Sequence, residues 1–99
     1  MNIQITVKDI INVTKGKLIY GNENEICENF SRNTKEVKQG DIYIGFKGEI
    51  YDGGVFYEEA FSNGAKGCII NEIEGLKLKE VENKFIIQVE DTVKAIGQI

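Results

Sequence analysis

Apolar residues in this chain fall into short segments separated by polar stretches that contain glycine. Residues 7–14 carry apolar side chains at helical spacing, and Thr6 with Asp9 three positions later has the form of a capping box. We therefore predict a short amphipathic helix over 7–14, with Gly16 as the residue that stops it. Two further helices are expected, one over 55–63 that ends at Asn63-Gly64 and one that follows the N-cap residue Asp91.

Five apolar segments predict β-strands. In residues 42–46 the apolar positions alternate, so Ile42, Ile44 and Phe46 share one face, and this is the clearest strand. Residues 66–70 and 85–89 are almost wholly apolar, as expected for strands covered on both faces of a sheet. The remaining strands are expected at 17–20 and 26–30, and the polar segment 71–84 could hold a short irregular helix.

Helices that alternate with apolar strands predict an α/β fold, a small mixed sheet flanked by helices. The 99 residues contain no repeat, low-complexity segment or internal linker, and their number suits a single domain. The core is expected to contain the apolar side chains of Ile42, Ile44, Phe46, Phe56, Ile69, Ile87 and Val89.

Composition narrows the classes of function. The chain has no run near the ~18 apolar residues of a membrane-spanning helix and no secretory-signal pattern, so we expect a cytoplasmic protein without membrane insertion. A net charge of −4 disfavours a nucleic-acid partner, because such proteins usually carry a basic surplus. The absence of histidine excludes Ser-His-Asp and Cys-His catalysis and His-ligated metal sites. Cys27 and Cys68 lack the spacing of a metal or redox pair and are expected to be small buried residues.

Two polar loops flank the clearest strand, at 31–35 and 47–54. Their hydroxyl, amide and cationic donors, with the backbone N–H groups of the glycines, suit phosphate or ribose. The glycine spacing from Gly48 resembles a P-loop, but Gly54 and Val55 stand where a P-loop needs Lys and Ser/Thr, so we expect no ATP hydrolysis by this segment. The residues by themselves therefore indicate a small α/β domain that could bind an anion, with a solvated surface as the alternative.

Linked motifs extend this picture to a known family. Residues 33–48 read Asn-Thr-Lys-Glu-Val-Lys-Gln-Gly-Asp-Ile-Tyr-Ile-Gly-Phe-Lys-Gly, residues 52–56 read Asp-Gly-Gly-Val-Phe, and residues 60–65 read Ala-Phe-Ser-Asn-Gly-Ala. Residues 89–97 read Val-Glu-Asp-Thr-Val-Lys-Ala-Ile-Gly. Together they resemble the N-terminal domain of Mur ligases of the MurE/MurF type. That family carries Asp-Ser-Arg-x-Val-x-x-Gly-Asp-Leu-Phe-Val-Ala-Leu-x-Gly, Asp-Gly-His-Asp-Phe, Ala-x-x-x-Gly-Ala and Val-x-Asp-Thr-x-x-Ala-Leu.

The resemblance spans nearly the whole chain, and the Gly16-Lys17-Leu18 opening looks more like MurF than MurE. It implies that residues 1–99 are the N-terminal domain of an ATP-dependent ligase of peptidoglycan and cell-wall synthesis, with roles in cell shape and cell division. This domain would hold the UDP end of UDP-N-acetylmuramoyl-tripeptide and do no bond chemistry, while the parent enzyme adds D-alanyl-D-alanine. ATP and Mg²⁺ would bind the central domain of the same polypeptide, which with the C-terminal domain lies outside this chain, and no cofactor or metal is expected here.

Transferred onto this sequence, the expected substrate-binding residues are Thr34, Lys35, Lys47, Gly48, Asp52 and Gly53. No catalytic residue is expected in the chain. Five of these residues have a structural alternative. Thr34 could form a turn, Lys35 could be solvated, Gly48 and Gly53 could serve turn geometry only, and Asp52 could cap the helix that begins near Val55.

The motifs also depart from the family pattern. Asn33-Thr34-Lys35 replaces Asp-Ser-Arg, which keeps the hydroxyl and the positive charge but loses the guanidinium fork. Gly54 and Val55 replace the family's His and second Asp. Two alternatives follow: a MurE-type domain for UDP-N-acetylmuramoyl-dipeptide, and a free-standing, non-catalytic interaction module of the same fold.

Overall fold

The computed structural model describes residues 5–47 and 52–98. The strands are β1 (Ile5–Thr6), β2 (Lys17–Tyr20), β3 (Ile26–Cys27), β4 (Phe30–Ser31), β5 (Ile42–Ile44), β6 (Gly67–Asn71) and β7 (Phe85–Val89). The helices are α1 (Val7–Thr14), α2 (Tyr57–Ser62) and α3 (Thr92–Gln98), with short 3₁₀ turns η1 (Thr34–Glu36) and η2 (Gly53–Phe56).

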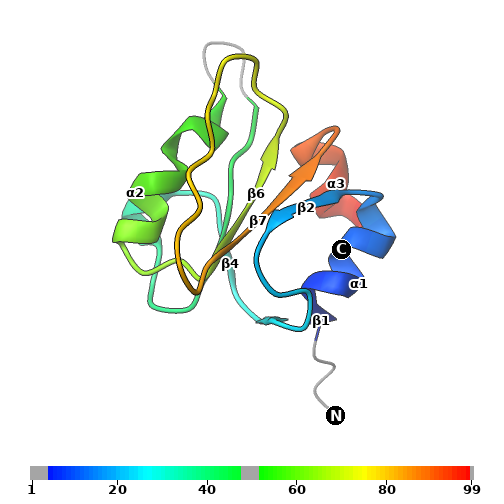
Figure 1. Ribbon diagram of the computed structural model, residues 1–99, viewed down its shortest axis with the longest axis horizontal. Coiled ribbons are helices and arrows are strands. Elements are labelled where there is room, and N and C mark those ends of the chain that lie inside the picture. Colours follow the sequence, from blue (N-terminus) through cyan, green and yellow to red (C-terminus); the bar gives the residue numbers. More distant parts are fainter. Residues whose placement is uncertain (1–4, 48–51, 99) are drawn as a thin grey trace.

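One mixed sheet organises these elements (Figure 1). Its strands lie in the order β2-β7-β6-β5-β4, with β2 antiparallel to β7 and all other neighbours parallel. Strands β1 and β3 form a separate antiparallel pair beside it. The parallel strands therefore all end at one edge of the sheet, which we call the carboxyl edge.

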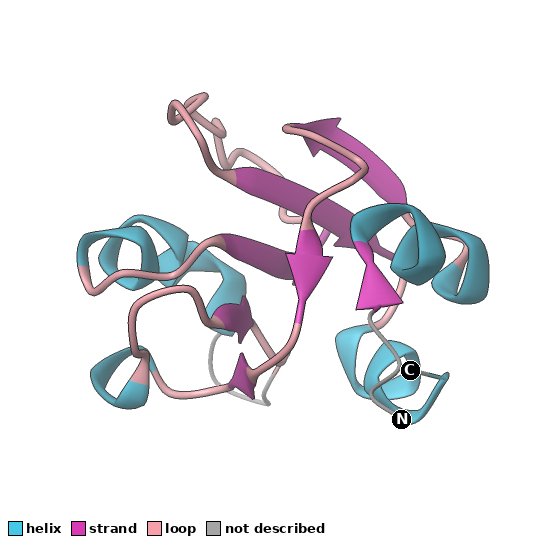
Figure 2. Ribbon diagram, turned by 90° about the horizontal axis from the view of Figure 1, so that it is seen from below, coloured by secondary structure: helices cyan, strands magenta, loops and turns pink. Residues whose placement is uncertain are grey.

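Helices cover both faces of the sheet, which gives three layers (Figures 1 and 2). Helices α1 and α3 pack on one face, where Ile10 and Ala95 join the sheet residues Ile42, Ile69 and Ile87 in one buried cluster. Helix α2 covers the other face, where buried side chains of α2 meet those of β5, β6 and β7 in a second cluster. The predicted fold class, a small mixed sheet flanked by helices, is confirmed.

Helix α1 shows how local sequence sets its ends. At its start the Thr6 N–H donates to Asp9 Oδ2 (2.9 Å) and the Asp9 N–H donates to Thr6 Oγ1 (3.3 Å), which confirms the predicted capping box. Its end differs from the prediction, because Lys15 and not Gly16 adopts the left-handed conformation, with φ of 60°. Gly16 serves close packing instead: a Cβ there would lie 3.0 Å from Gln88 O of β7.

Three predicted strands have different limits. The predicted strand over 26–30 is two strands, because β3 pairs with β1 whereas β4 pairs with β5. The strand expected over 42–46 ends at Ile44, although the Gly45 N–H still donates to Ile69 O (2.9 Å). The strand expected over 66–70 begins at Gly67 and extends to Asn71.

The predicted helix over 55–63 begins earlier and changes type along its length. Asp52 caps the 3₁₀ turn η2, and the α-helix proper starts only at Tyr57. The tighter turn points Tyr57 inward, at 1% exposure, and leaves Phe56 39% exposed, so the prediction of Phe56 as a core residue is wrong. Phe46, another predicted core residue, is only partly buried.

Residues 71–84 contain no helix in the structure. Instead the segment crosses the α2 face of the sheet, where Leu76, Leu78 and Val81 pack against the cluster. The Tyr57 hydroxyl fixes the segment, since it donates to Lys77 O (3.3 Å) and accepts from the Lys79 N–H (3.1 Å).

Candidate functional site

At the carboxyl edge, the connections that follow β6 and β7 leave toward opposite faces of the sheet. After β6 the chain passes over the α2 face, whereas after β7 it turns into α3 on the opposite face. When the connections of two neighbouring parallel strands leave in opposite directions, a crevice opens outside the strand ends, and ligands of α/β sheets bind there. This edge is therefore the candidate site.

A hollow of about 370 Å³ lies at that position. Strands β6 and β7 contribute Asn71 and Val89 to its lining, together with three lysines. Lys15 and Lys17 lie two positions apart, after α1 and at the start of β2, whereas Lys47 follows β5, so the meeting of Lys47 with the other two depends on the fold. The complete lining is Lys15, Lys17, Lys47, Asn71, Glu72, Gln88, Val89 and Glu90.

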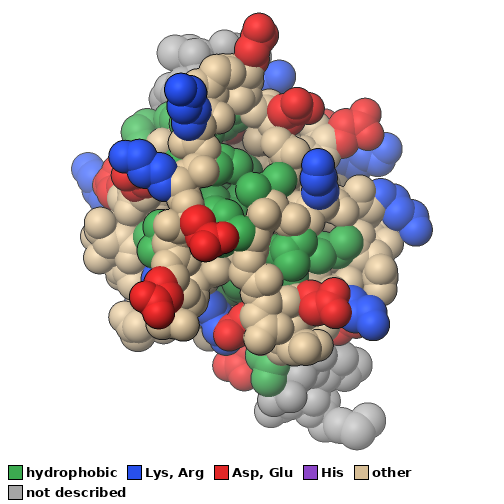
Figure 3. Space-filling view, in the orientation of Figure 1, with side chains coloured by type: hydrophobic (Ala, Val, Ile, Leu, Met, Phe, Trp, Pro, Cys, Tyr) green, Lys and Arg blue, Asp and Glu red, His purple; other side chains and the backbone are tan. Residues whose placement is uncertain are grey.

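The three lysines are exposed, and no side-chain hydrogen bond or ion pair joins them to another residue within 5–47 and 52–98. In the part of the chain that the structure describes, the one ion pair joins Lys66 to Glu25, so neither Glu72 nor Glu90 pairs with them. Unpaired ammonium groups around a concave surface attract anions, although the two glutamates reduce the field. On the face shown in Figure 3, acidic and basic side chains alternate around a central apolar area, so that face has no continuous basic patch.

The residues next to β5 and η2 contact one another beside the hollow. Lys47 and Asp52 form a bridge, and the Gly53 N–H donates to Phe46 O (2.8 Å). The Tyr43 hydroxyl donates to Gly53 O (2.8 Å) from the sheet beneath. The structure therefore brings three predicted site residues together: Lys47, Asp52 and Gly53.

Asp52 acts as a cap and as an anchor. Its Oδ1 accepts from the Gly54 N–H (2.9 Å), and its Oδ2 accepts from Asn71 Nδ2 (3.3 Å). The capping alternative stated for Asp52 is confirmed, with η2 starting at Gly53 and not near Val55. Both carboxylate oxygens thus hold protein groups.

Thr34 and Lys35 lie against a different element. The Thr34 hydroxyl donates to Glu59 Oε1 (3.0 Å), and Asn63 Nδ2 donates to Thr34 O (2.8 Å), so η1 is fixed to α2. Lys35 is exposed in η1. No hydrogen bond among residues 5–47 and 52–98 connects these two residues with Lys47 or Asp52. Gly48, the remaining predicted residue, lies outside the described residues.

Sequence reasoning missed Lys15, Lys17 and Asn71 as residues of this edge. Asn71 carried a usable signal, since a polar residue that ends a fully apolar parallel strand lies at the carboxyl edge. The two lysines carried none, because β2 is antiparallel and its first residue reaches the same edge only through its register with Gln88.

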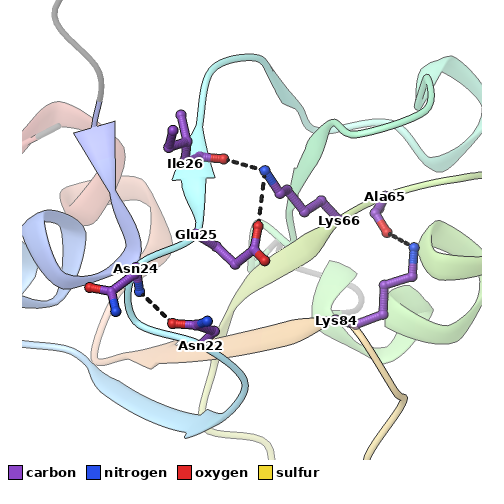
Figure 4. Close-up of polar contacts among 7 residues, drawn as sticks. All are labelled: Asn22, Asn24, Glu25, Ile26, Ala65, Lys66 and Lys84. Atoms are coloured by element: carbon purple, nitrogen blue, oxygen red, sulfur yellow. Dashed lines mark hydrogen bonds and ion pairs between the residues drawn. The ribbon is translucent and has the colours of Figure 1, made fainter.

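Contacts at the opposite, amino edge serve the fold (Figure 4). Lys66 Nζ donates to Ile26 O (2.8 Å) and lies 3.1 Å from Glu25 Oε2, which connects β3 to the start of β6. Lys84 Nζ donates to Ala65 O (2.7 Å). Because these ammonium groups are engaged by protein oxygens, the lysines of the carboxyl edge are the better candidates for a ligand.

The cysteines offer no reactive chemistry. Both are buried free thiols, as expected, and burial raises the pKa of Cys27 to about 11 and raises that of Cys68 as well. Within residues 5–47 and 52–98, no cluster of three or more Cys, Asp or Glu side chains could hold a metal ion. No helix of that part of the chain has the length and apolar character needed to cross a membrane.

No protein-family model matches the chain. A 2,6-diaminopimelate ligase acting on UDP-N-acetylmuramoyl-L-alanyl-D-glutamate, from Prochlorococcus marinus, is 38% identical over 72% of this chain and 14% of its own length. The UDP-N-acetylmuramoyl-tripeptide–D-alanyl-D-alanine ligase of Bacillus subtilis is 31% identical over 98% of this chain and 21% of its own length. The chain thus spans at most about a fifth of these two relatives.

Solved structures agree with the sequence relatives. MurF from Acinetobacter baumannii covers 97% of this chain with a TM-score of 0.74 at 20% identity, which shows the shared fold. MurF from Thermotoga maritima, solved with ADP, covers 70% with a TM-score of 0.55 at 33% identity. The fold and the sequence similarity together identify this chain as a domain of the Mur ligase family. The chain belongs to the MurE/MurF type of that family and fits an N-terminal domain most like that of MurF.

Proposed function

We propose that this chain recognises the UDP end of a UDP-N-acetylmuramoyl-peptide for a peptidoglycan-precursor ligase. The hollow at the carboxyl edge, with Lys15, Lys17 and Lys47 around it, is the observation that carries the proposal. Its ammonium groups suit a diphosphate, and the neighbouring Gly53 is held by hydrogen bonds with Phe46 O and the Tyr43 hydroxyl. The relatives support the ligand class, because both curated names given above describe UDP-N-acetylmuramoyl-peptide ligases.

The contribution of such a domain to the reaction is binding energy and position. The bond is formed at the peptide end of the substrate, far from the nucleotide, so contacts to UDP act by holding the substrate in place. The segment that begins at Gly48 lacks the P-loop residues for ATP and Mg²⁺, since Gly54 and Val55 occupy the positions of the Lys and Ser/Thr. We assign both to a central domain of the parent enzyme, which would act in the cytoplasm.

The proposal has two forms, which differ in the peptide substrate and in the group that the parent enzyme adds to it. The Bacillus subtilis relative favours a tripeptide substrate to which D-alanyl-D-alanine is added, and its similarity extends over 98% of the chain. The Prochlorococcus relative, at 38% identity, favours a MurE-type domain with a dipeptide substrate. Both forms place the same UDP group at the same edge.

An NMR shift titration of the 99-residue chain tests the proposal. We expect UDP-N-acetylmuramoyl-tripeptide to shift the amides of Lys15, Lys17, Lys47 and Gly53 more strongly than equal ATP does. Lys17→Met and Lys47→Met should each weaken binding by about two- to fivefold, because each removes one exposed charge beside the diphosphate. Lys8→Met, on the exposed side of α1, is the matched control and should bind as the parent chain does.

Salt and competitors provide further criteria. Affinity should fall as ionic strength rises from about 0.05 to 0.5 M, because exposed charge contacts are screened. No shifts at millimolar ligand, or equal shifts with ATP, would refute the proposal and favour the interaction module. Shifts at Thr34 and Lys35 without shifts at the three lysines would move the site to η1.

A further inference from the structure

A buried polar network lies beneath the candidate site and joins it to α3. Asn71 at the end of β6 is 3% exposed, and Thr92 at the start of α3 is fully buried. The Thr92 N–H donates to Asn71 Oδ1 (2.8 Å), and Asn71 Nδ2 donates to Thr92 Oγ1 (3.3 Å) and to Asp52 Oδ2 (3.3 Å). Three segments distant in sequence thus meet at one amide.

The chemistry of the partners fixes the orientation of that amide. The Thr92 N–H can only donate, so it requires the amide oxygen, and the Asp52 carboxylate can only accept, so it requires the NH₂ group. The Asn71 oxygen therefore accepts from the Thr92 N–H, while its NH₂ group donates to Asp52 and to the Thr92 hydroxyl. Neither a carboxylate nor an apolar side chain at position 71 satisfies both partners, and a buried polar group without a partner is costly.

Asp52 in turn contacts Lys47 and Gly54, two of the residues around the hollow and the start of η2. With Oδ2 held by Asn71, its Oδ1 is directed at the Gly54 N–H, and its backbone forms the bridge with Lys47. The Gly53 N–H is directed at Phe46 O by the same turn. Asp52 thus connects Lys47 with the donor at position 71.

We propose that Asn71 and Thr92 are positioning residues, which hold Asp52 and through it Lys47 and Gly53 in the geometry that binds the anionic end of the ligand. This inference rests on the proposed function for the ligand. Asn71 borders the hollow, but its amide groups are engaged by Thr92 and Asp52, so it acts through Asp52, and Thr92 acts through Asn71. Asp52 is the charged member of the network, and Asp91 caps α3 next to Thr92. The charged residues that line the hollow beside it are Lys15, Lys17, Lys47, Glu72 and Glu90.

Asn71→Asp is the decisive variant. It keeps an acceptor for the Thr92 N–H and removes the NH₂ group that donates to Asp52 and to the Thr92 hydroxyl. The link from position 71 to Asp52 is thus lost, while the link to the Thr92 backbone is retained. The added charge would weaken anion binding by itself, and Gln88→Glu controls for this, because Gln88 lines the same hollow outside the network. Asn24→Asp makes the same substitution at an exposed turn of the amino edge and controls for the chemistry of the change (Figure 4).

Two measurements separate this inference from the proposed function. Without ligand, Asn71→Asp should shift the Gly53, Gly54 and Lys47 amides, and Gln88→Glu and Asn24→Asp should leave Gly53 and Gly54 in place. With UDP as the probe, Asn71→Asp should bind about tenfold more weakly than the parent chain, and Gln88→Glu about threefold. If the parent chain fails to bind UDP, the proposed function fails, and the ligand-free spectra still decide whether the network positions Gly53 and Gly54.

The inference is wrong if Asn71→Asp leaves the Gly53 and Gly54 amides unchanged, or if its loss of affinity equals that of Gln88→Glu. Should Asn71→Asp fail to fold, Thr92→Val and Thr92→Ser carry the test. Thr92→Val removes the acceptor for Asn71 Nδ2, whereas Thr92→Ser keeps it. The Thr92→Ser chain should therefore bind UDP as the parent chain does, and the Thr92→Val chain should bind UDP more weakly. Equal affinity of these two variants overturns the inference.

Discussion

Gly45 makes a contact whose disruption can be calculated from the structure. A Cβ at this position would lie 2.5 Å from Gly54 N and 2.6 Å from Gly54 Cα, both backbone atoms that cannot rotate away. Ordinary contacts of this kind need roughly 3.5 Å, so Gly45→Ala has to move the Gly53-Gly54 backbone by about 1 Å. A shift of that size breaks the bonds that Gly53 makes with Phe46 O and with the Tyr43 hydroxyl, each 2.8 Å long.

The expected loss of stability follows from these terms. Two hydrogen bonds contribute about 2 kcal/mol, and overpacking of this kind usually adds about 1 kcal/mol or more. Gly45→Ala should therefore lower the free energy of unfolding by about 3 kcal/mol, a large part of the ~5–15 kcal/mol that a domain has. The melting temperature should fall by roughly 12–24 °C.

Urea unfolding followed by circular dichroism measures this change. Gly97→Ala is the matched control, because a Cβ at Gly97 in α3 meets no atom within 4 Å. The same substitution there should stabilise the chain by about 0.5 kcal/mol, since alanine favours helix over glycine. A Gly45→Ala chain within about 0.5 kcal/mol of the parent would refute the packing argument.

Three further results are expected. Hydrogen bonds from Thr6 lower the pKa of Asp9 below its usual 3.8. The carboxylate therefore stabilises the fold above about pH 4, and this stabilisation is lost as the pH falls through the folded-state pKa. Asp9→Asn should remove this part of the pH dependence of the free energy of unfolding, as measured by urea titrations at several pH values. Because burial raises the pKa of Cys27 to about 11 and also raises that of Cys68, both thiols should react slowly with a disulfide reagent at pH 8 and fast once urea unfolds the chain; fast reaction of the folded chain would contradict this. A Cβ on Gly67 would overlap the Phe85 ring, so Gly67→Ala should destabilise by about 2–4 kcal/mol and Phe85→Leu in the same chain should recover part of the loss, as a double-mutant cycle would show.

The sequence pattern predicted correctly those helices and strands that are set by interactions between residues close in sequence. The capping box of α1 and the apolar strands β6 and β7 could be predicted, because each depends on neighbours within a few residues. The family could also be predicted from linked motifs, since their spacing survives where single residues change. The limits of strands were less accurate, because strand length depends on partners elsewhere in the chain.

Some residues of the candidate site could likewise be predicted from the sequence, and others could not. Lys47, Asp52 and Gly53 were predicted from one loop of the sequence, and the structure places them together. Thr34 and Lys35 belong to the same predicted set, yet Thr34 is bonded to Glu59 of α2. Which residues share an edge depends on the paths that the loops take over the two faces, and adjacency in a motif does not encode those paths.

The sequence by itself determined the fold class, the helical cap, the apolar core strands and the absence of histidine chemistry. Only the tertiary structure decided that Lys15 and Lys17 meet Lys47, and that Asn71 connects Asp52 to Thr92. The physical reason is the range of the interactions. Propensity, capping and hydrophobic periodicity act over a few residues, whereas the convergence of charges and the satisfaction of a buried amide require the strand order β2-β7-β6-β5 to be in place.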